Sequence, residues 1–100
     1  MTDPAAPSEK VRVLVVDDHQ VFAEALSALL NAEPDFEVVA TAATTTQAAA
    51  AADSHSPDVA VVDVELGGSD GVELAGRLRE EHPGLKVVCV TCLEDASRVV

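Results

Sequence analysis

Apolar residues along the chain fall into two alternating patterns, short continuous runs and longer stretches at helical spacing. Short runs rich in valine indicate buried strands. Such runs occur at Val11 to Val16, Phe36 to Ala40, Val59 to Val64 and Leu85 to Val90. Apolar or alanine-rich stretches at helical spacing indicate helices between the strands. These helices are expected from Val21 to Leu30, after Thr44 and from Val72 to about Glu81, and another is expected to begin at Asp95.

The alternation of strands and helices predicts an α/β fold with a parallel sheet covered on both faces. We expect residues 1–10 to be a flexible leader and residues 11–100 to form one domain. The flavodoxin-like doubly wound fold has the strand order 2-1-3-4-5. Only four such strands can be recognised, so the fifth strand and the last helix would be absent from this chain. The sequence therefore predicts a fragment of a longer protein, with a domain that is incomplete at its C-terminus.

Polar residues follow the predicted strands where each strand ends. Asp17 and Asp18 follow the first strand, Asp63 lies near the end of the third, and Thr91 follows the fourth. In a doubly wound sheet, the carboxyl ends of strands one and three border the ligand-binding crevice. Three carboxylates in one crevice repel one another unless a cation offsets their charge. Because hard divalent ions prefer oxygen ligands, the pattern predicts an Mg²⁺ site.

Composition excludes several classes of partner. The formal net charge is -12, from 18 acidic and 6 basic residues. Direct binding to nucleic acid or to an anionic membrane is not expected, because both need a basic patch. The chain shows no charged leader followed by an apolar segment, and no apolar run of membrane-spanning length. We therefore expect a cytoplasmic location.

The cysteines and histidines give weaker signals. Cys89 and Cys92 are three residues apart on a predicted strand, so their side chains should point to opposite faces rather than converge on a metal. We expect two reduced thiols, one of them in the core. The three histidines, His19, His55 and His82, lack metal-ligand spacing and are expected on the surface or in loops.

Helix caps offer simpler explanations for some polar residues. Thr44 and Gln47 have the spacing of a capping box. Asp70 followed by Gly71 predicts a cap and turn rather than a ligand. Asp18, taken alone, could equally cap the helix that starts near His19. Phe22, Leu26 and Leu29 are expected in the core.

Three segments in combination resemble the receiver domain of bacterial two-component response regulators. They are VLVVDDHQVF, PDVAVVDVELGGSDGVEL and VVCVTC. The opening DDH-x-x-F together with LLNAEPDFEVV resembles the NarL/LuxR-type subgroup. The likeness covers nearly the whole chain from about Val11. It implies a phosphorylation-controlled signalling switch, whose partner is a sensor histidine kinase, and not an enzyme in its own right.

The resemblance also implies roles for single residues. Asp63 would be the phosphate acceptor, Asp18 a direct Mg²⁺ ligand and Asp17 a ligand largely through water. The backbone carbonyl of Glu65 would be a third protein contact to the metal, and Thr91 would be the switch hydroxyl that bonds the phosphoryl group. Full regulators of this subgroup usually bind DNA through a further C-terminal domain, which is absent from this chain.

The sequence departs from the family pattern in three ways. Leu66, Gly67 and Gly68 stand where the family usually has Met-Pro-Gly, which predicts a mobile loop. Cys92 stands where the family favours a small residue, and the family's lysine on a fifth strand would lie beyond Val100.

Two other functions stay open at this point. One is a degenerate receiver that acts as a phosphorylation-independent interaction module. The other is an aspartate-nucleophile phosphohydrolase resembling the haloacid dehalogenase family, although those enzymes have D-x-D after the first strand and this chain has Asp17, Asp18 and His19. The unpaired edge of the strand LKVVCV also predicts homo-oligomers.

Overall fold

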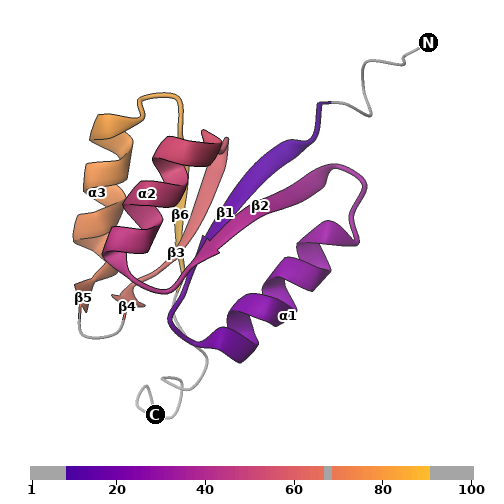
Figure 1. Ribbon diagram of the computed structural model, residues 1–100, viewed down its shortest axis with the longest axis horizontal. Helices are drawn as coiled ribbons and strands as arrows, with labels where there is room; N and C mark the ends of the chain where they lie inside the picture. The colour runs from indigo at the N-terminus through magenta and orange to yellow at the C-terminus, as the bar shows by residue number, and fades with distance from the viewer. Residues whose placement is uncertain (1–8, 67–68, 91–100) are drawn as a thin grey trace.

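The computed structural model of the protein describes residues 9–66 and 69–90. Its elements are β1 (Val11–Val16), α1 (Gln20–Asn31), β2 (Phe36–Ala42), α2 (Thr45–His55), β3 (Val59–Asp63), β4 (Glu65–Leu66), β5 (Ser69–Asp70), α3 (Gly71–Glu81) and β6 (Lys86–Val90). The four strands of the central sheet alternate with helices along the chain, and two short strands, β4 and β5, stand between β3 and α3 (Figure 1). Thr91, Cys92 and the helix expected from Asp95 lie outside the described residues.

Four parallel strands form the central sheet in the order β2-β1-β3-β6. Because β6 is the fourth of the strands expected from the sequence, the predicted order 2-1-3-4 is confirmed over the described strands. In β1, Val13 to Val16 are all buried, as the continuous valine-rich run predicts. The sheet therefore has β1 and β3 at its centre, and their carboxyl ends lie side by side.

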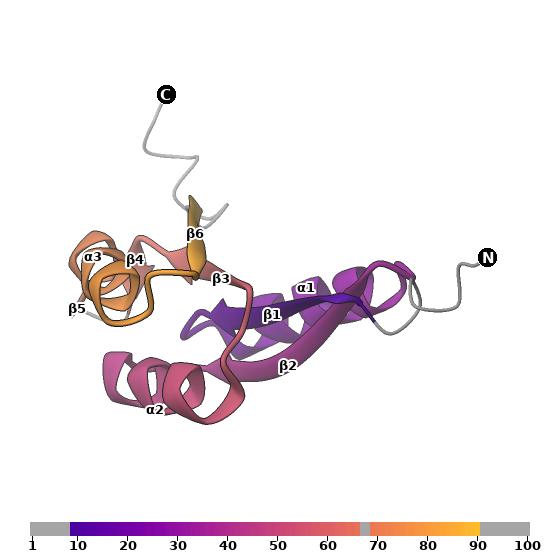
Figure 2. The ribbon, with the colours of Figure 1, turned by 90° about the horizontal axis from the view of Figure 1, so that it is seen from above.

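Helices cover both faces of this sheet, as predicted. On one face, α2 and α3 bury Ala48, Ala52, Leu74 and Leu78 against Leu14, Val16, Ala60 and Val62 of β1 and β3. On the other face, Ala23, Leu26 and Leu30 of α1 pack against Val13 and Val15. Figure 2 shows α1 and α2 on opposite sides of β1 and β2. The core is thus two apolar layers separated by the sheet.

The capping box predicted for α2 is present. The hydroxyl of Thr44 accepts a hydrogen bond from the backbone N–H of Gln47 at 3.0 Å, and the side-chain oxygen of Gln47 accepts one from the backbone N–H of Ala43 at 2.8 Å. At the other end of the helix, the Arg12 guanidinium donates to the carbonyl oxygens of His55 and Ser56. The bonds at the start of α2 are local and cap the helix, whereas the bonds from Arg12 tie the end of the helix to β1.

One prediction about the core is wrong. Leu29 is 69% exposed, because the face of α1 that meets the sheet carries Leu26 and Leu30. Leu29 lies about 100° around the helix from Leu30 and points away from that face. Cys89 is a free, exposed thiol on β6, and the expectation that one of the two cysteines lies in the core stays a prediction, because Cys92 lies outside the described residues.

The segment after β3 contains more regular structure than the sequence indicated. The predicted glycine-rich loop includes β4 and β5, which pair in antiparallel fashion, Glu65 with Asp70 and Leu66 with Ser69.

Among the described helices, none combines the length and the apolar character that crossing a membrane requires.

Two leucines that sequence patterns treat alike should differ in their effect on stability. Leu78 is 1% exposed between α3 and the sheet, and Leu29 is 69% exposed. We expect Leu78→Ala to lower the free energy of unfolding by about 2–5 kcal/mol, and Leu29→Ala to change it by less than about 0.5 kcal/mol. Urea denaturation of both variants measures the difference. Equal losses would contradict the placement of α1 on the sheet.

Candidate functional site

The site lies at the carboxyl ends of β1 and β3. The two strands pair in register, with Val16 beside Val62, so the residues that follow these positions, Asp17 and Asp63, are neighbours. Asp17 continues the β1 ladder through a hydrogen bond from its backbone N–H to the carbonyl of Ala42 at 2.9 Å. The parallel register therefore brings the two carboxylates together, as the sequence predicts.

These two carboxylates are buried, which is unusual for aspartate. Asp17 is 4% exposed and Asp63 is 0% exposed. Asp18 is exposed and supplies a third carboxylate. One ligand atom from each of Asp17, Asp18, His19 and Asp63 lies within 4.8 Å of the others. The three predicted acidic site residues are thus brought together, and His19 joins them.

Hydrogen bonds satisfy only part of this cluster. Oδ1 of Asp17 accepts from the backbone N–H of His19 at 2.8 Å, and Oδ1 of Asp63 accepts from the backbone N–H of Glu65 at 3.1 Å. Among the described residues, the other carboxylate oxygens, Oδ2 of Asp17 and Oδ2 of Asp63, have no hydrogen-bond partner. Buried carboxylate oxygens without donors fit the oxygen-rich environment that Mg²⁺ or Ca²⁺ requires.

The pKa of Asp63 is raised above its ordinary value of 3.8. Desolvation of the buried carboxyl is the largest cause, and the charges of Asp17 and Asp18 act in the same direction. The hydrogen bond from the Glu65 backbone and the nearby His19 oppose the shift. The net effect is that the fold makes the charged form of the Asp63 carboxyl less favourable than it is in water.

His19 was expected on the surface or in a loop. It does lie in the loop between β1 and α1, but the sequence did not indicate that it belongs to the site. Its Nδ1 atom lies 2.9 Å from Oδ1 of Asp17, 3.2 Å from Oδ1 of Asp18 and 3.6 Å from Oδ2 of Asp63. His19 is also the N-cap residue of α1, and its side chain makes no cap hydrogen bond. The alternative in which Asp18 caps this helix is therefore wrong, and the Asp18 carboxylate lies in the acidic cluster.

Gly71 is a second residue whose role the sequence did not reveal. A Cβ atom at this position would lie 2.0 Å from the backbone carbonyl oxygen of Asp63 and 2.8 Å from Cα of Val64. Its N–H donates to the carbonyl of Val64 at 3.1 Å. Asp70 caps α3 as expected, accepting from the N–H groups of Val72 and Glu73. The missing side chain of Gly71 therefore lets α3 start directly against the backbone of Asp63.

Two further residues, Glu65 and Thr91, were predicted to contact the metal and the phosphoryl group. Glu65 follows the site in β4 with an exposed side chain, and its backbone N–H is oriented towards Asp63. Its carbonyl as a metal ligand stays a prediction. Thr91 lies outside the described residues, directly after Val90, which pairs with Asp63 across β3 and β6.

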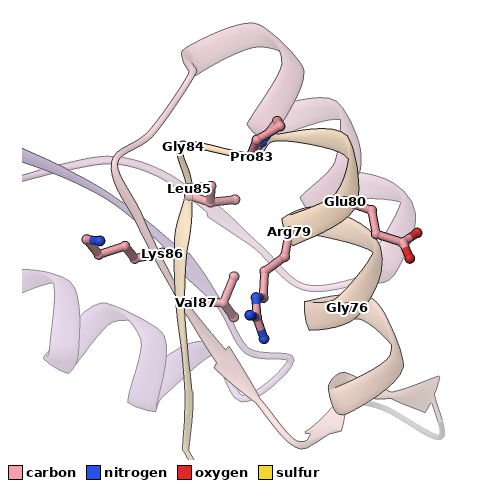
Figure 3. Close-up of a pocket in the computed structure, with 8 residues that line it drawn as sticks. All are labelled: Gly76, Arg79, Glu80, Pro83, Gly84, Leu85, Lys86 and Val87. Atoms are coloured by element: carbon pink, nitrogen blue, oxygen red, sulfur yellow. The ribbon is translucent and has the colours of Figure 1, made fainter.

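If cavity size were the only criterion, a different part of the molecule would be chosen as the functional site. A cavity of about 490 Å³ borders the acidic cluster, lined by Asp17 and Asp18 together with residues of α1, β2 and α2. A larger one of about 930 Å³ lies between the end of α3 and the start of β6 (Figure 3). In Figure 3, Arg79 extends along this cavity towards Val87, and Glu80 points away from it. The larger cavity is at the opposite end of the strands and holds no cluster of carboxylates.

Comparison with known families agrees with this geometry. The family description of the response regulator receiver domain matches residues 13–100. The chain belongs to this family. Over 81% of its length the chain is 40% identical to the DNA-binding transcriptional activator DevR/DosR of Mycobacterium tuberculosis, a regulator of the NarL/LuxR type. The resemblance to the NarL/LuxR-type subgroup is therefore confirmed.

Solved receiver structures share the fold. The receiver domain of the response regulator NarL from Mycobacterium tuberculosis has a TM-score of 0.76 and 34% identity, over 83% of this chain and 67% of that one. A response regulator from Burkholderia pseudomallei, solved with a phosphorylated aspartic acid, a calcium ion and citrate, has a TM-score of 0.73 and 28% identity, over 80% of this chain and 46% of that one. The flavodoxin-like fold predicted for this receiver domain is confirmed.

The curated relatives are longer than this chain. The chain spans 37% of the length of DevR/DosR. It spans 26% of a protein-glutamate methylesterase/protein-glutamine glutaminase of Bradyrhizobium diazoefficiens, to which it is 35% identical over 94% of its own length. The shared part is the receiver domain, and the regions beyond it differ between transcription regulators and enzymes.

The burial of Asp63 should make stability depend on pH. Because its pKa is raised on folding, the unfolded chain releases this proton first, and the free energy of unfolding falls as pH rises above about 3.8 and through the native pKa. Asp63→Asn should therefore stabilise the metal-free receiver at pH 7 and raise its melting temperature.

Thermal melts of the two proteins from pH 3 to pH 8, with a chelator present, measure this difference. We expect the gap to close at the acid end, where both states are protonated. Asp35→Asn, at an exposed aspartate before β2, is the matched control and should change little. A stabilisation by Asp63→Asn that is the same at every pH would contradict the electrostatic cause.

Proposed function

We propose that this receiver domain is a phosphorylation-controlled switch in which Asp63 accepts a phosphoryl group from a sensor histidine kinase. The observation that carries the proposal is the fully buried Asp63 carboxylate, whose Oδ2 has no hydrogen-bond partner among the described residues. This oxygen is the nucleophile. An aspartate oxygen that is not engaged by hydrogen-bond donors keeps its electron density for attack on phosphorus.

The neighbouring residues support this role. Asp18 and Asp63 would hold Mg²⁺ directly, Asp17 largely through water, and Glu65 through its backbone carbonyl. When bound, Mg²⁺ supplies positive charge that neutralises both the carboxylates and the transferring group. The Glu65 N–H fixes Oδ1 of Asp63 at 3.1 Å, which leaves the other oxygen as the one that reacts. The phosphorylated aspartic acid and calcium ion in the Burkholderia pseudomallei regulator support the same assignment here.

Readout would depend on Thr91. This residue directly follows Val90, the β6 residue paired with Asp63, and it carries a hydroxyl. We assign Thr91 as the hydroxyl that bonds the phosphoryl group. The output would be transcriptional, through a DNA-binding domain like that of DevR/DosR.

A degenerate receiver that binds partners without phosphorylation is the second candidate. Leu66 and Gly67 in place of the family's usual Met-Pro favour it, since a rigid proline is replaced by glycine in the segment after the acceptor. The phosphohydrolase alternative loses its basis, because the chain belongs to the receiver family.

Metal binding can be tested without phosphate. We expect Mg²⁺ to bind weakly, as it does at sites where it keeps several waters, and to shift the amide resonances of Asp17, Asp18 and Asp63. Asp18→Ala should abolish these shifts because it removes a direct ligand, and Asp35→Ala should preserve them. An NMR titration gives the result. Shifts centred elsewhere would contradict the site assignment.

Phosphorylation can be tested with small donors. Acetyl phosphate with Mg²⁺ should form an acyl phosphate that intact-protein mass spectrometry detects, and beryllofluoride should bind at the same place. Asp63→Ala should remove both responses and retain the fold, whereas Asp35→Ala should keep them. A label that survives Asp63→Ala would move the acceptor, and no label on the unmodified protein would favour the degenerate receiver.

We also propose that the chain forms homo-oligomers through β6. Among the described residues this strand pairs only with β3, no described strand lies on its other edge, and Val88 is 49% exposed. Light scattering coupled to size exclusion should detect dimers that Val88→Lys disrupts. Val72→Lys, at a 59% exposed valine on α3, is the matched control. A monomer at high concentration would contradict this proposal.

A further inference from the structure

His19 lies where a ligand of the bound cation would lie. Its Nδ1 atom is 2.9, 3.2 and 3.6 Å from one oxygen each of Asp17, Asp18 and Asp63. Adjacent ligands of an octahedral ion with bonds of about 2.1 Å are about 3 Å apart, and opposite ligands are about 4.2 Å apart. The span of 4.8 Å for the four ligand atoms is only slightly larger. The nitrogen therefore has the spacing of a fourth ligand.

The orientation of the imidazole follows from the local backbone. The His19 N–H donates to Oδ1 of Asp17, which fixes the residue against that carboxylate, and its extended backbone at the start of α1 directs Nδ1 to the cluster. The side chain is about one-third exposed, so solvent and ions can reach it. Independent support for a ligand comes from Oδ2 of Asp17, which is buried and has no hydrogen-bond partner among the described residues.

We propose that His19 is a nitrogen ligand that gives this centre a preference for late first-row transition metal ions over Mg²⁺. Imidazole favours Co²⁺, Ni²⁺, Cu²⁺ and Zn²⁺, whereas three carboxylates and water alone favour Mg²⁺. The proposal rests on the proposed metal site and adds a fourth ligand to it. The neutral imidazole presents the Nδ1 lone pair to the ion, with the proton on Nε2.

The other two histidines do not compete for this role. His82 lies at the end of α3, with Nε2 at 3.2 Å from Oδ1 of Asp53. His55 is exposed at the end of α2, and its backbone carbonyl accepts a hydrogen bond from the Arg12 guanidinium. His55→Ala is therefore a matched control, because it removes an imidazole without touching the acidic cluster.

The test measures Ni²⁺ and Mg²⁺ affinities by calorimetry for the unmodified protein, His19→Ala and His55→Ala. His19→Ala keeps the backbone N–H to Asp17, and α1 receives no cap hydrogen bond from the lost side chain. Removing a residue that hydrogen-bonds to a metal ligand typically lowers metal affinity by about 10–100-fold. Removing a ligand itself should therefore weaken Ni²⁺ binding by at least about tenfold. Mg²⁺ affinity should change by less than about threefold, and His55→Ala should change neither.

Pulsed electron paramagnetic resonance of the Cu²⁺-loaded protein gives a second readout. Coupling to the remote nitrogen of a bound imidazole should be present in the unmodified protein and in His55→Ala, and absent in His19→Ala. Equal Ni²⁺ affinities with and without His19, or retained coupling in His19→Ala, would overturn the inference while leaving the Mg²⁺ site intact. If Asp18→Ala bound both ions unchanged, the proposed site itself would be wrong.

Discussion

The structure depends on the parallel register of β1 and β3, which forces two buried carboxylates together. Asp17 and Asp63 follow residues that pair across the two central strands, so neither can move away from the other without breaking the sheet. Their charges are desolvated as well as adjacent, and this combination raises the pKa of Asp63. The fold thus maintains an unfavourable arrangement that only a cation or a proton relieves.

The residues around the cluster show how the fold tolerates this arrangement. Each buried carboxylate accepts a hydrogen bond from the backbone N–H of the residue two positions after it, His19 for Asp17 and Glu65 for Asp63. Gly71 lets α3 begin against the backbone of Asp63, where any Cβ would collide with its carbonyl. Additional hydrogen-bond donors would stabilise the buried carboxylates, but they would also occupy the oxygens that a ligand needs. At this site, therefore, features that favour the stability of the fold work against ligand binding.

Sequence patterns determined the strands, their order and the acidic cluster, because these follow from local periodicity and from the geometry of parallel sheets. The caps at Thr44 and Asp70 were equally visible, since capping depends on residues three or fewer apart. The exposure of Leu29 was not, because it depends on which face of α1 meets the sheet. Gly71 was interpreted as a turn residue, since its contact with Asp63 is a close approach in space.

The convergence of three consecutive residues on one point has a simple backbone cause. Within a strand, Asp17 and Asp18 would point to opposite faces. Asp17 is the last residue held by the β2 ladder, and the chain bends at Asp18 before α1 begins. The alternation ends there, so Asp18 and His19 turn towards the carboxylate that precedes them instead of away from it. Sequence patterns that are read separately for strands and for helices treat this junction only as a boundary, although two carboxylates and an imidazole come together there.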